Sequence, residues 1–183
     1  MKNGNLCYEL ARPKNLYFMW YFKVLGQRLA NVVMRFLPLV IVVSLLPSPF
    51  QLGGACSVSA FFLFLLSLGI GALLVTALSV LYPIITLRTL NEKGIVNIVI
   101  VLADILSGVV VPIPFFPEVL QDISRLLPFQ YISDLPFRIY VGDIGISAGL
   151  GGIVIQFIWL FLLIIIGFFI MKHSMKRVVV QGG

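Results

Sequence analysis

The chain has 183 residues, of which 60% are hydrophobic and 11% are charged, and its mean hydropathy is +1.09. Because about 25% of residues are charged in soluble globular proteins, this composition excludes that class and predicts an integral membrane protein. A net charge of +6 would suggest nucleic acid as the partner of a soluble domain. Here the basic residues lie at the ends of apolar runs, as topology signals do, so no nucleic-acid partner is expected.

Residues 1–28 combine basic residues with a dense group of aromatic side chains. The basic residues are Lys2, Arg12, Lys14, Lys23 and Arg28. Aromatic rings beside positive charge are typical of a segment at the level of the lipid headgroups. We expect a cytosolic or interfacial segment, with a helix broken at Arg12 and Pro13.

The first two apolar runs predict the first two spanning helices, at about 29–46 and 58–81. Pro38 should kink the first span, and Arg35 lies inside it. In the second span, a strip of small residues from Gly69 to Ala72 offers close helix contact.

Two further runs, at about 94–111 and 146–171, predict the third and fourth spans. The transmembrane domain would therefore cover residues 29–177, and residues 178–183 form a tail. The expected fold is an all-α integral membrane protein with four transmembrane helices.

Residues 112–142 remain apolar but are interrupted by prolines, so they cannot form one straight spanning helix. Between the breaks, 117–127 and 129–140 can be helical, but each is shorter than the roughly 20 residues that a bilayer crossing needs. This pattern predicts a short re-entrant helical hairpin between the last two spans. Its aromatic residues serve either as interfacial anchors or as part of a gate.

The distribution of basic residues predicts the orientation of the chain. Ten lysines and arginines flank one side of the predicted spans, whereas Arg125 and Arg138 lie on the other side among four acidic residues. Both termini are therefore expected in the cytoplasm, and the hairpin is expected outside the cell. The chain would be a multi-pass protein of the cell membrane.

Two ionisable residues, Arg35 and Asp104, lie inside the predicted spans. Because a charge deep in a bilayer costs at least about 2.5 kcal/mol, each should face a partner or a watery cavity. Their expected depths, about 9 and 15 Å, would let them pair between the first and third spans. Such a pair either locks helix packing or contacts a transported substrate.

The sequence carries no motif for catalysis or for a cofactor. It has no phosphate-binding G-x-x-x-x-G-K-[ST] loop, no H-E-x-x-H and no G-x-S-x-G. Cys7 and Cys56 fall on opposite sides of the predicted bilayer, so neither a disulfide nor a metal site is expected. We therefore expect no enzyme activity and no cofactor in this chain.

Residues 107–142, which the prolines interrupt, contain short motifs in this order: Ser-Gly, then Pro, Phe-Phe-Pro, Leu-Pro-Phe, Pro and Tyr-x-Gly. In this order the chain resembles the carboxyl-terminal part of the ABC-2 type transporter permeases, the membrane subunits of ATP-driven exporters. Members of that family place a pair of short extracellular re-entrant helices between their last two spans. The matching residues are Ser107, Gly108, Pro112, Phe116, Pro117, Pro128, Phe129, Pro136, Tyr140 and Gly142.

The resemblance implies a permease subunit whose ATP is bound and hydrolysed on separate ATPase subunits. It also implies a second permease chain, in a homo- or heterodimer. The sequence does not identify the substrate, although an apolar lining of the path weakly favours lipids, hydrophobic drugs or peptides over ions. The cytosolic segment before the first span here would contact the ATPase. The residues expected in this coupling contact are Leu6, Tyr8, Arg12 and Pro13.

The resemblance leaves the amino-terminal pair of spanning helices of the family without a counterpart in residues 1–183. Two alternatives to an active permease follow. One is an inactive truncated permease, and the other is a non-transporting four-helix accessory protein. A neighbouring gene for an ATPase would favour the permease.

Overall fold

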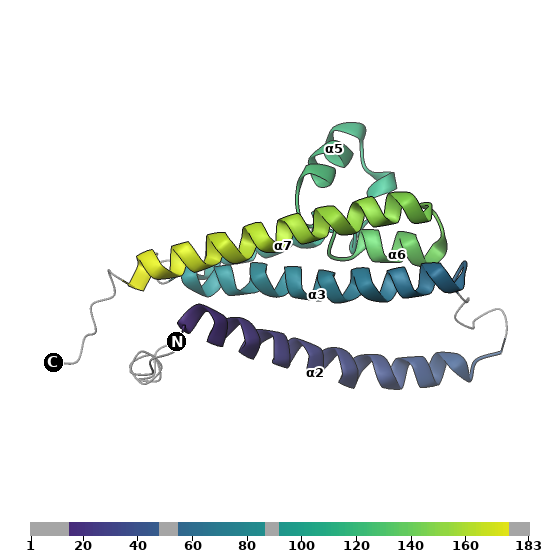
Figure 1. Ribbon diagram of the computed structural model, residues 1–183, viewed down its shortest axis with the longest axis horizontal. Helices are drawn as coiled ribbons and strands as arrows, with labels where there is room; N and C mark the ends of the chain where they lie inside the picture. The colour runs from purple at the N-terminus through teal and green to yellow at the C-terminus, as the bar shows by residue number, and fades with distance from the viewer. Residues whose placement is uncertain (1–14, 48–54, 87–91, 176–183) are drawn as a thin grey trace.

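The computed structural model describes residues 15–47, 55–86 and 92–175, and within these ranges all regular secondary structure is helical. This confirms the all-α prediction. The longer helices lie side by side along the long axis of the molecule, and one short helix stands out from them (Figure 1). In chain order they are α2 (Leu16–Ser44), α3 (Val58–Thr86), α4 (Glu92–Leu106), the short 3-10 helix η1 (Ile113–Phe115), α5 (Glu118–Leu126), α6 (Asp134–Val141) and α7 (Ile146–Met175).

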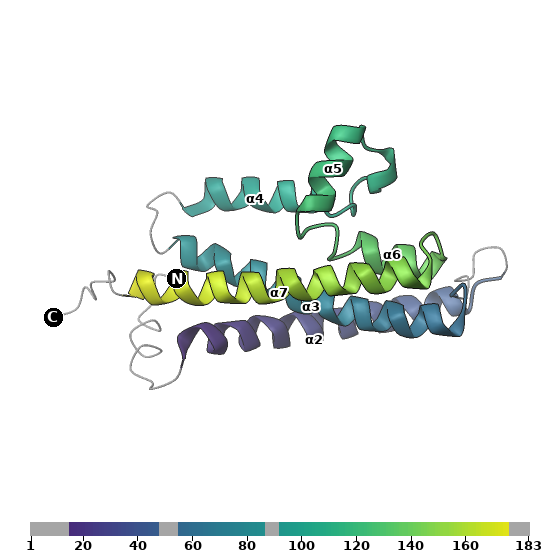
Figure 2. The same ribbon diagram turned by 45° about the horizontal axis from the view of Figure 1, so that its top comes forward.

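Helices α3 and α7 run in the same direction and pack against each other, while α2 and α4 run in the opposite direction (Figures 1 and 2). The main core lies where the first half of α2 meets α3 and α7. In Figure 2, α4 and α5 lie on one side of α7 and α2 lies on the other. The junction between α3 and α7 is therefore the centre of the fold.

Helix α2 begins at Leu16, whereas the span was expected to begin at residue 29, so much of the expected interfacial segment belongs to one continuous helix. Tyr17, Trp20 and Tyr21 are buried in the core and do not lie free at the headgroup level. The Tyr21 hydroxyl donates to the Leu73 carbonyl oxygen at 2.9 Å, which offsets the cost of burying this polar group. Gly167 of α7 has no side chain and so leaves space for the Tyr17 ring.

Helix α3 continues through Pro83 to Thr86, beyond the expected end at residue 81. A proline in a helix removes one backbone hydrogen bond, and the helix nevertheless continues between the completely buried Val80 and Ile84 on either side of Pro83. The small-residue strip acts at one position: Gly71 lies under the backbone of Ile132, whereas Gly69 faces open space.

Helix α4 has 15 residues and ends before Ser107, whereas a span over 94–111 was expected. At 1.5 Å per residue it rises about 22 Å, less than the roughly 30 Å of a bilayer core. Within the described residues, three helices are long and apolar enough to cross a membrane: Leu16–Ser44, Val58–Ile84 and Ile146–Met175. A fourth crossing is thus not confirmed.

The proline-rich region contains two short helices, α5 and α6, joined by a turn. Helix α6 begins at Asp134, whereas a start near Phe129 was expected. Side-chain hydrogen bonds hold this turn, in place of the backbone hydrogen bonds of a helix. The Gln130 side-chain amide and the Tyr131 hydroxyl both donate to the Arg125 carbonyl oxygen, at 3.3 and 3.1 Å.

Candidate functional site

The turn between α5 and α6 is attached to the middle of the α3–α7 junction through Gln156. The Gln156 amide nitrogen donates to the carbonyl oxygens of Tyr131, at 2.6 Å, and Ser67, at 3.1 Å. The Ser67 hydroxyl donates to the Gln156 amide oxygen at 3.1 Å. Ser67 and Gln156 are fully buried. Gln156 lies about 15 Å along α7 from its start, so the turn reaches well inside the bundle.

Two glycines of the motif adopt the left-handed backbone conformation that other residues avoid. Gly108 follows the end of α4 and has φ +79°. A Cβ at this position would lie 3.3 Å from the Asp134 side chain. Gly142, with φ +83°, ends α6, and a Cβ there would lie 2.7 Å from the Cys56 sulfur. Both positions therefore require glycine to bring the short helices back against the bundle.

The prolines of the motif lie at the ends of the short helices. Pro112 and Pro117 precede η1 and α5, and Phe116 lies between these two elements. Pro128 and Pro136 are buried, in the turn and in the first turn of α6.

The aromatic residues of the region serve more than one role. Phe129 packs against the main core, and Tyr140 meets Phe64 of α3 with ring centroids 5.0 Å apart. The hydroxyl of the buried Tyr131 is used within the turn, whereas Phe115 is 79% exposed. The interpretation of all these rings as interfacial anchors is therefore wrong for Tyr131.

Arg138 of α6 holds the end of the hairpin together electrostatically. Its Nε donates to the Asp143 carboxylate at 2.6 Å, and its Nη1 lies 3.8 Å from the Asp134 carboxylate. Burial raises the pKa of the Asp134 carboxyl above its ordinary 3.8, Arg138 acts against this rise and Asp143 adds to it.

A pocket of about 440 Å³, which we call the hairpin pocket, lies between α3, α4 and the turn. Its polar lining residues are Ser79 and Tyr82 from α3, Asp104 from α4, Ser107 directly after α4, Ser133 from the turn and Arg28 from α2. Its apolar lining includes Val75, Leu78 and Ile100. The pocket therefore places a carboxylate and a guanidinium within one largely apolar cavity.

A second cavity, the α2 groove, has a volume of about 650 Å³ and follows one face of α2. Its polar residues are Gln27, Arg28, Asn31 and Arg35, and its apolar residues are Val24, Val32, Phe36 and Leu39. These positions recur at three- and four-residue spacing, so they form one stripe along the helix. The groove therefore carries two guanidiniums within a helix that is long and apolar enough to span the bilayer.

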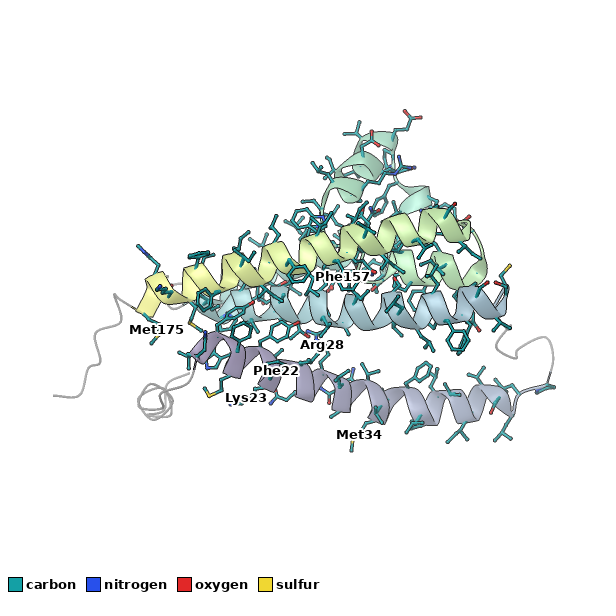
Figure 3. All side chains as sticks on the ribbon, in the orientation of Figure 1. Phe22, Lys23, Arg28, Met34, Phe157 and Met175 are labelled. Carbon is teal, nitrogen blue, oxygen red and sulfur yellow. The ribbon has the colours of Figure 1, made fainter. Side chains whose placement is uncertain are left out.

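Arg28 lines both cavities and lies on the side of α2 that faces α3 (Figure 3). Its Nη2 donates to the Ser79 hydroxyl at 2.7 Å. Its Nε is buried and has no hydrogen-bond partner in the part of the chain that the structure describes. Arg28 therefore links the two cavities and keeps an unused donor.

The structure does not bring Arg35 and Asp104 together. They line different cavities, and no ion pair joins them among the described residues. The arginine that lines the same pocket as Asp104 is Arg28, which lies within α2. The expected coupling residues Leu6, Tyr8, Arg12 and Pro13 lie outside the described residues.

Sequence reasoning missed Arg28, Asn31 and Gln156 as site residues. Arg28 and Asn31 share helical spacing with Arg35, which was a usable signal. Gln156 is a lone amide in a long apolar run, a second signal, since intramembrane polar groups usually find partners. Within the described ranges, no group of three or more His, Cys, Asp or Glu side chains could hold a metal ion.

Comparison with known proteins gives one match. A family model described as ABC-2 family transporter protein matches residues 1–182. No curated protein and no solved structure matches the chain.

Proposed function

The chain belongs to the ABC-2 transporter family, and on this premise we propose that it is the permease subunit of an ATP-binding cassette exporter driven by a separate ATPase. The family supplies the membrane component of an ABC-type transporter, which is not itself catalytic. The observation that carries the proposal is the family match over residues 1–182, and it is supported by three helices long and apolar enough to cross a membrane and by charged residues that line cavities beside two of them.

We propose four crossings, with α4 as the third, the hairpin outside the cell and both termini in the cytoplasm. Helices α3 and α7 run in the same direction, so the chain must return between them, and α4 runs the opposite way (Figure 2). The Cys56 amide donates to the Tyr140 carbonyl oxygen at 3.2 Å, which links the start of α3 to the hairpin end of the bundle. The basic residues at the other end support a cytoplasmic location for it.

Thiol labelling of intact cells tests this orientation. Cys56 is exposed and free. In a Cys7→Ser chain, a membrane-impermeant maleimide should label Cys56 in intact cells. In a Cys56→Ser chain it should label Cys7 only after the cells are permeabilised. The reverse pattern would contradict an outward hairpin.

We propose that the α2 groove and the hairpin pocket form part of the transport path, with the hairpin as its outer gate. Arg28 connects the two cavities, and the turn at Ile132 and Ser133 forms the far wall of the pocket. If the hairpin is a gate, Pro128→Ala should change transport more than it changes assembly with partner chains. An equal loss of transport and assembly would contradict the gate.

ATP binding on the partner would act on the cytosolic segments, including residues 1–14, and tilt the spans so that the path opens outward. A second permease chain, identical or different, would complete the path. The test of this function is purification of the tagged chain from native membranes, followed by identification of the bound proteins and an assay of ATP hydrolysis.

Recovery of an ATPase and a second permease, with ATP hydrolysis in the purified complex, is the expected result. The Arg125→Gln variant serves as a matched control, since this exposed arginine of α5 lies outside both cavities and should leave the complex intact. Recovery of the chain alone, without nucleotide hydrolysis, would contradict the permease and favour an accessory protein.

A further inference from the structure

We infer that the α2 groove and the hairpin pocket together bind an amphiphile with one anionic headgroup, a phosphate or a carboxylate, held at Arg28 and Arg35. This inference rests on the proposed function, because it names the substrate class of the path. It depends on three features of the two cavities: an unused donor, an excess of positive charge and an apolar lining.

The unused donor belongs to Arg28. Only its Nη2 has a recorded acceptor, the Ser79 hydroxyl at 2.7 Å, while the buried Nε has none among the described residues. A guanidinium presents its donors in a fixed planar fork that matches the oxygens of a phosphate or a carboxylate. The Arg28 guanidinium has further N–H donors beyond the one that Ser79 accepts, and a ligand oxygen in the pocket that Arg28 lines would accept from them.

The charge excess comes from α2. Arg28 and Arg35 lie on one stripe of this helix with the Asn31 amide between them, and the sequence of α2 contains no acidic residue. Across the described side chains that line the two cavities, Asp104 is the one carboxylate against two guanidiniums. Since uncompensated charge inside a bilayer is costly, one further negative charge would balance this site.

The apolar lining indicates that the anion carries a hydrocarbon chain. Val32, Phe36 and Leu39 continue the α2 groove beyond the arginines. The hairpin pocket, at about 440 Å³, falls within the size range of small-molecule pockets, and the α2 groove, lined by α2 alone, adds an open and partly apolar face. A free inorganic anion would leave this apolar surface unused, so we favour an amphiphile over the anion alone.

The test is native mass spectrometry of the full chain in neutral detergent, titrated separately with lysophosphatidic acid, lysophosphatidylcholine, dodecyltrimethylammonium and inorganic phosphate. Retention of lysophosphatidic acid, at one per chain and in preference to the other three probes, is expected. Arg28→Gln should weaken its binding by at least about tenfold, because a charge-assisted hydrogen bond is lost. Arg35→Gln should weaken it by a smaller factor, since Arg35 is exposed.

Asp104→Asn separates anion binding from a packing role. Removing the one carboxylate should strengthen lysophosphatidic acid binding by about two- to fivefold, because a repulsion disappears. Arg125→Gln, remote from both cavities, should leave binding unchanged. If Arg28→Gln does not accumulate in the membrane, the exposed positions Arg35 and Asp104 still decide the question.

Several results would overturn the inference. Weaker lysophosphatidic acid binding in Asp104→Asn would contradict a repulsive role for this carboxylate, and preferential retention of dodecyltrimethylammonium or lysophosphatidylcholine would indicate a cationic or zwitterionic ligand. Equal competition by inorganic phosphate would indicate a site for the anion alone. Absence of lysophosphatidic acid binding while the ATPase is still recovered would contradict the inferred substrate class but not the proposed permease function. Binding without any associated ATPase would instead contradict the proposed function and support a lipid-binding protein.

Discussion

The two sides of this bundle differ in whether their polar groups have hydrogen-bond partners. On the α3–α7 side, Ser67, Gln156 and the Tyr131 carbonyl satisfy one another within a fully buried cluster. On the α2 side, Arg28 keeps an unmet buried donor, and Asn31 and Arg35 line an open groove. Satisfied buried networks fix one arrangement, whereas unmet groups need a ligand or water. The α3–α7 side therefore holds the turn between α5 and α6 through satisfied hydrogen bonds, whereas the α2 side keeps a buried donor without a partner among the described residues.

The largest expected effect on the free energy of unfolding is on the α3–α7 side. Gln156→Leu removes three hydrogen bonds and leaves two carbonyl oxygens and a hydroxyl buried without this partner. Since hydrogen bonds within membranes average about 0.6 kcal/mol each, we expect a loss of at least about 2 kcal/mol in unfolding free energy. The measurement is unfolding of the purified chain in mixed micelles by titration with sodium dodecyl sulfate.

The matched control for Gln156→Leu is Asn31→Leu, the same amide-to-leucine change on the open side. Asn31 is exposed, and no hydrogen bond to it is recorded among the described residues. We expect a change within about 0.5 kcal/mol. Equal losses in both variants would abolish the contrast between the two sides.

A second test uses two glycines of α3. A Cβ on Gly71 would lie 2.8 Å from the Ile132 carbonyl oxygen, whereas a Cβ on Gly69 would meet nothing within 4 Å. Gly71→Ala must push the turn away and should cost about 1–3 kcal/mol. Gly69→Ala should be neutral or stabilise the chain by up to about 1 kcal/mol. Equal stability of the two variants would show that the turn does not pack against α3 at Gly71.

A third test concerns the end of α6. Gly142→Ala places a side chain in the left-handed region and against Cys56, so we expect a loss of about 1–2 kcal/mol from backbone conformation alone. Gly151→Ala, in open space within α7, is the control and should not destabilise the chain. Retention of full stability by Gly142→Ala would show that α6 can end in another conformation.

The smallest effect is a pH dependence from Asp134. Because burial raises the pKa of this carboxyl above 3.8, the folded state holds the proton more tightly than the unfolded state does. Its contribution to stability is therefore fully present below pH 3.8 and falls as pH rises through the raised pKa. Between about pH 3 and pH 7, Asp134→Asn should flatten this fall in thermal unfolding, whereas Asp122→Asn should not. An unchanged slope in Asp134→Asn would contradict the shift.

Part of the site was readable from the sequence because some constraints are local. Prolines end helices wherever they occur, so the interruption after α4 and the two short helices were predicted correctly in kind. Gly108 and Gly142 were picked out only as members of the motif, and the structure adds that both have positive φ. The start of α2 could not be read in this way, since residues 16–28 are aromatic and basic and fit either an interface or a core.

The sequence by itself determined that this chain is helical and apolar and that prolines interrupt its helices. Composition, the length of apolar runs and the effect of proline are local properties that do not depend on distant segments. Tertiary structure decided which charge lies near Asp104, because that depends on the register between α2, α3 and α4. It also decided that Gln156 joins the hairpin to the bundle, since the bond to Tyr131 spans 25 residues of chain. Contacts between distant segments follow from packing, and local pattern does not contain them.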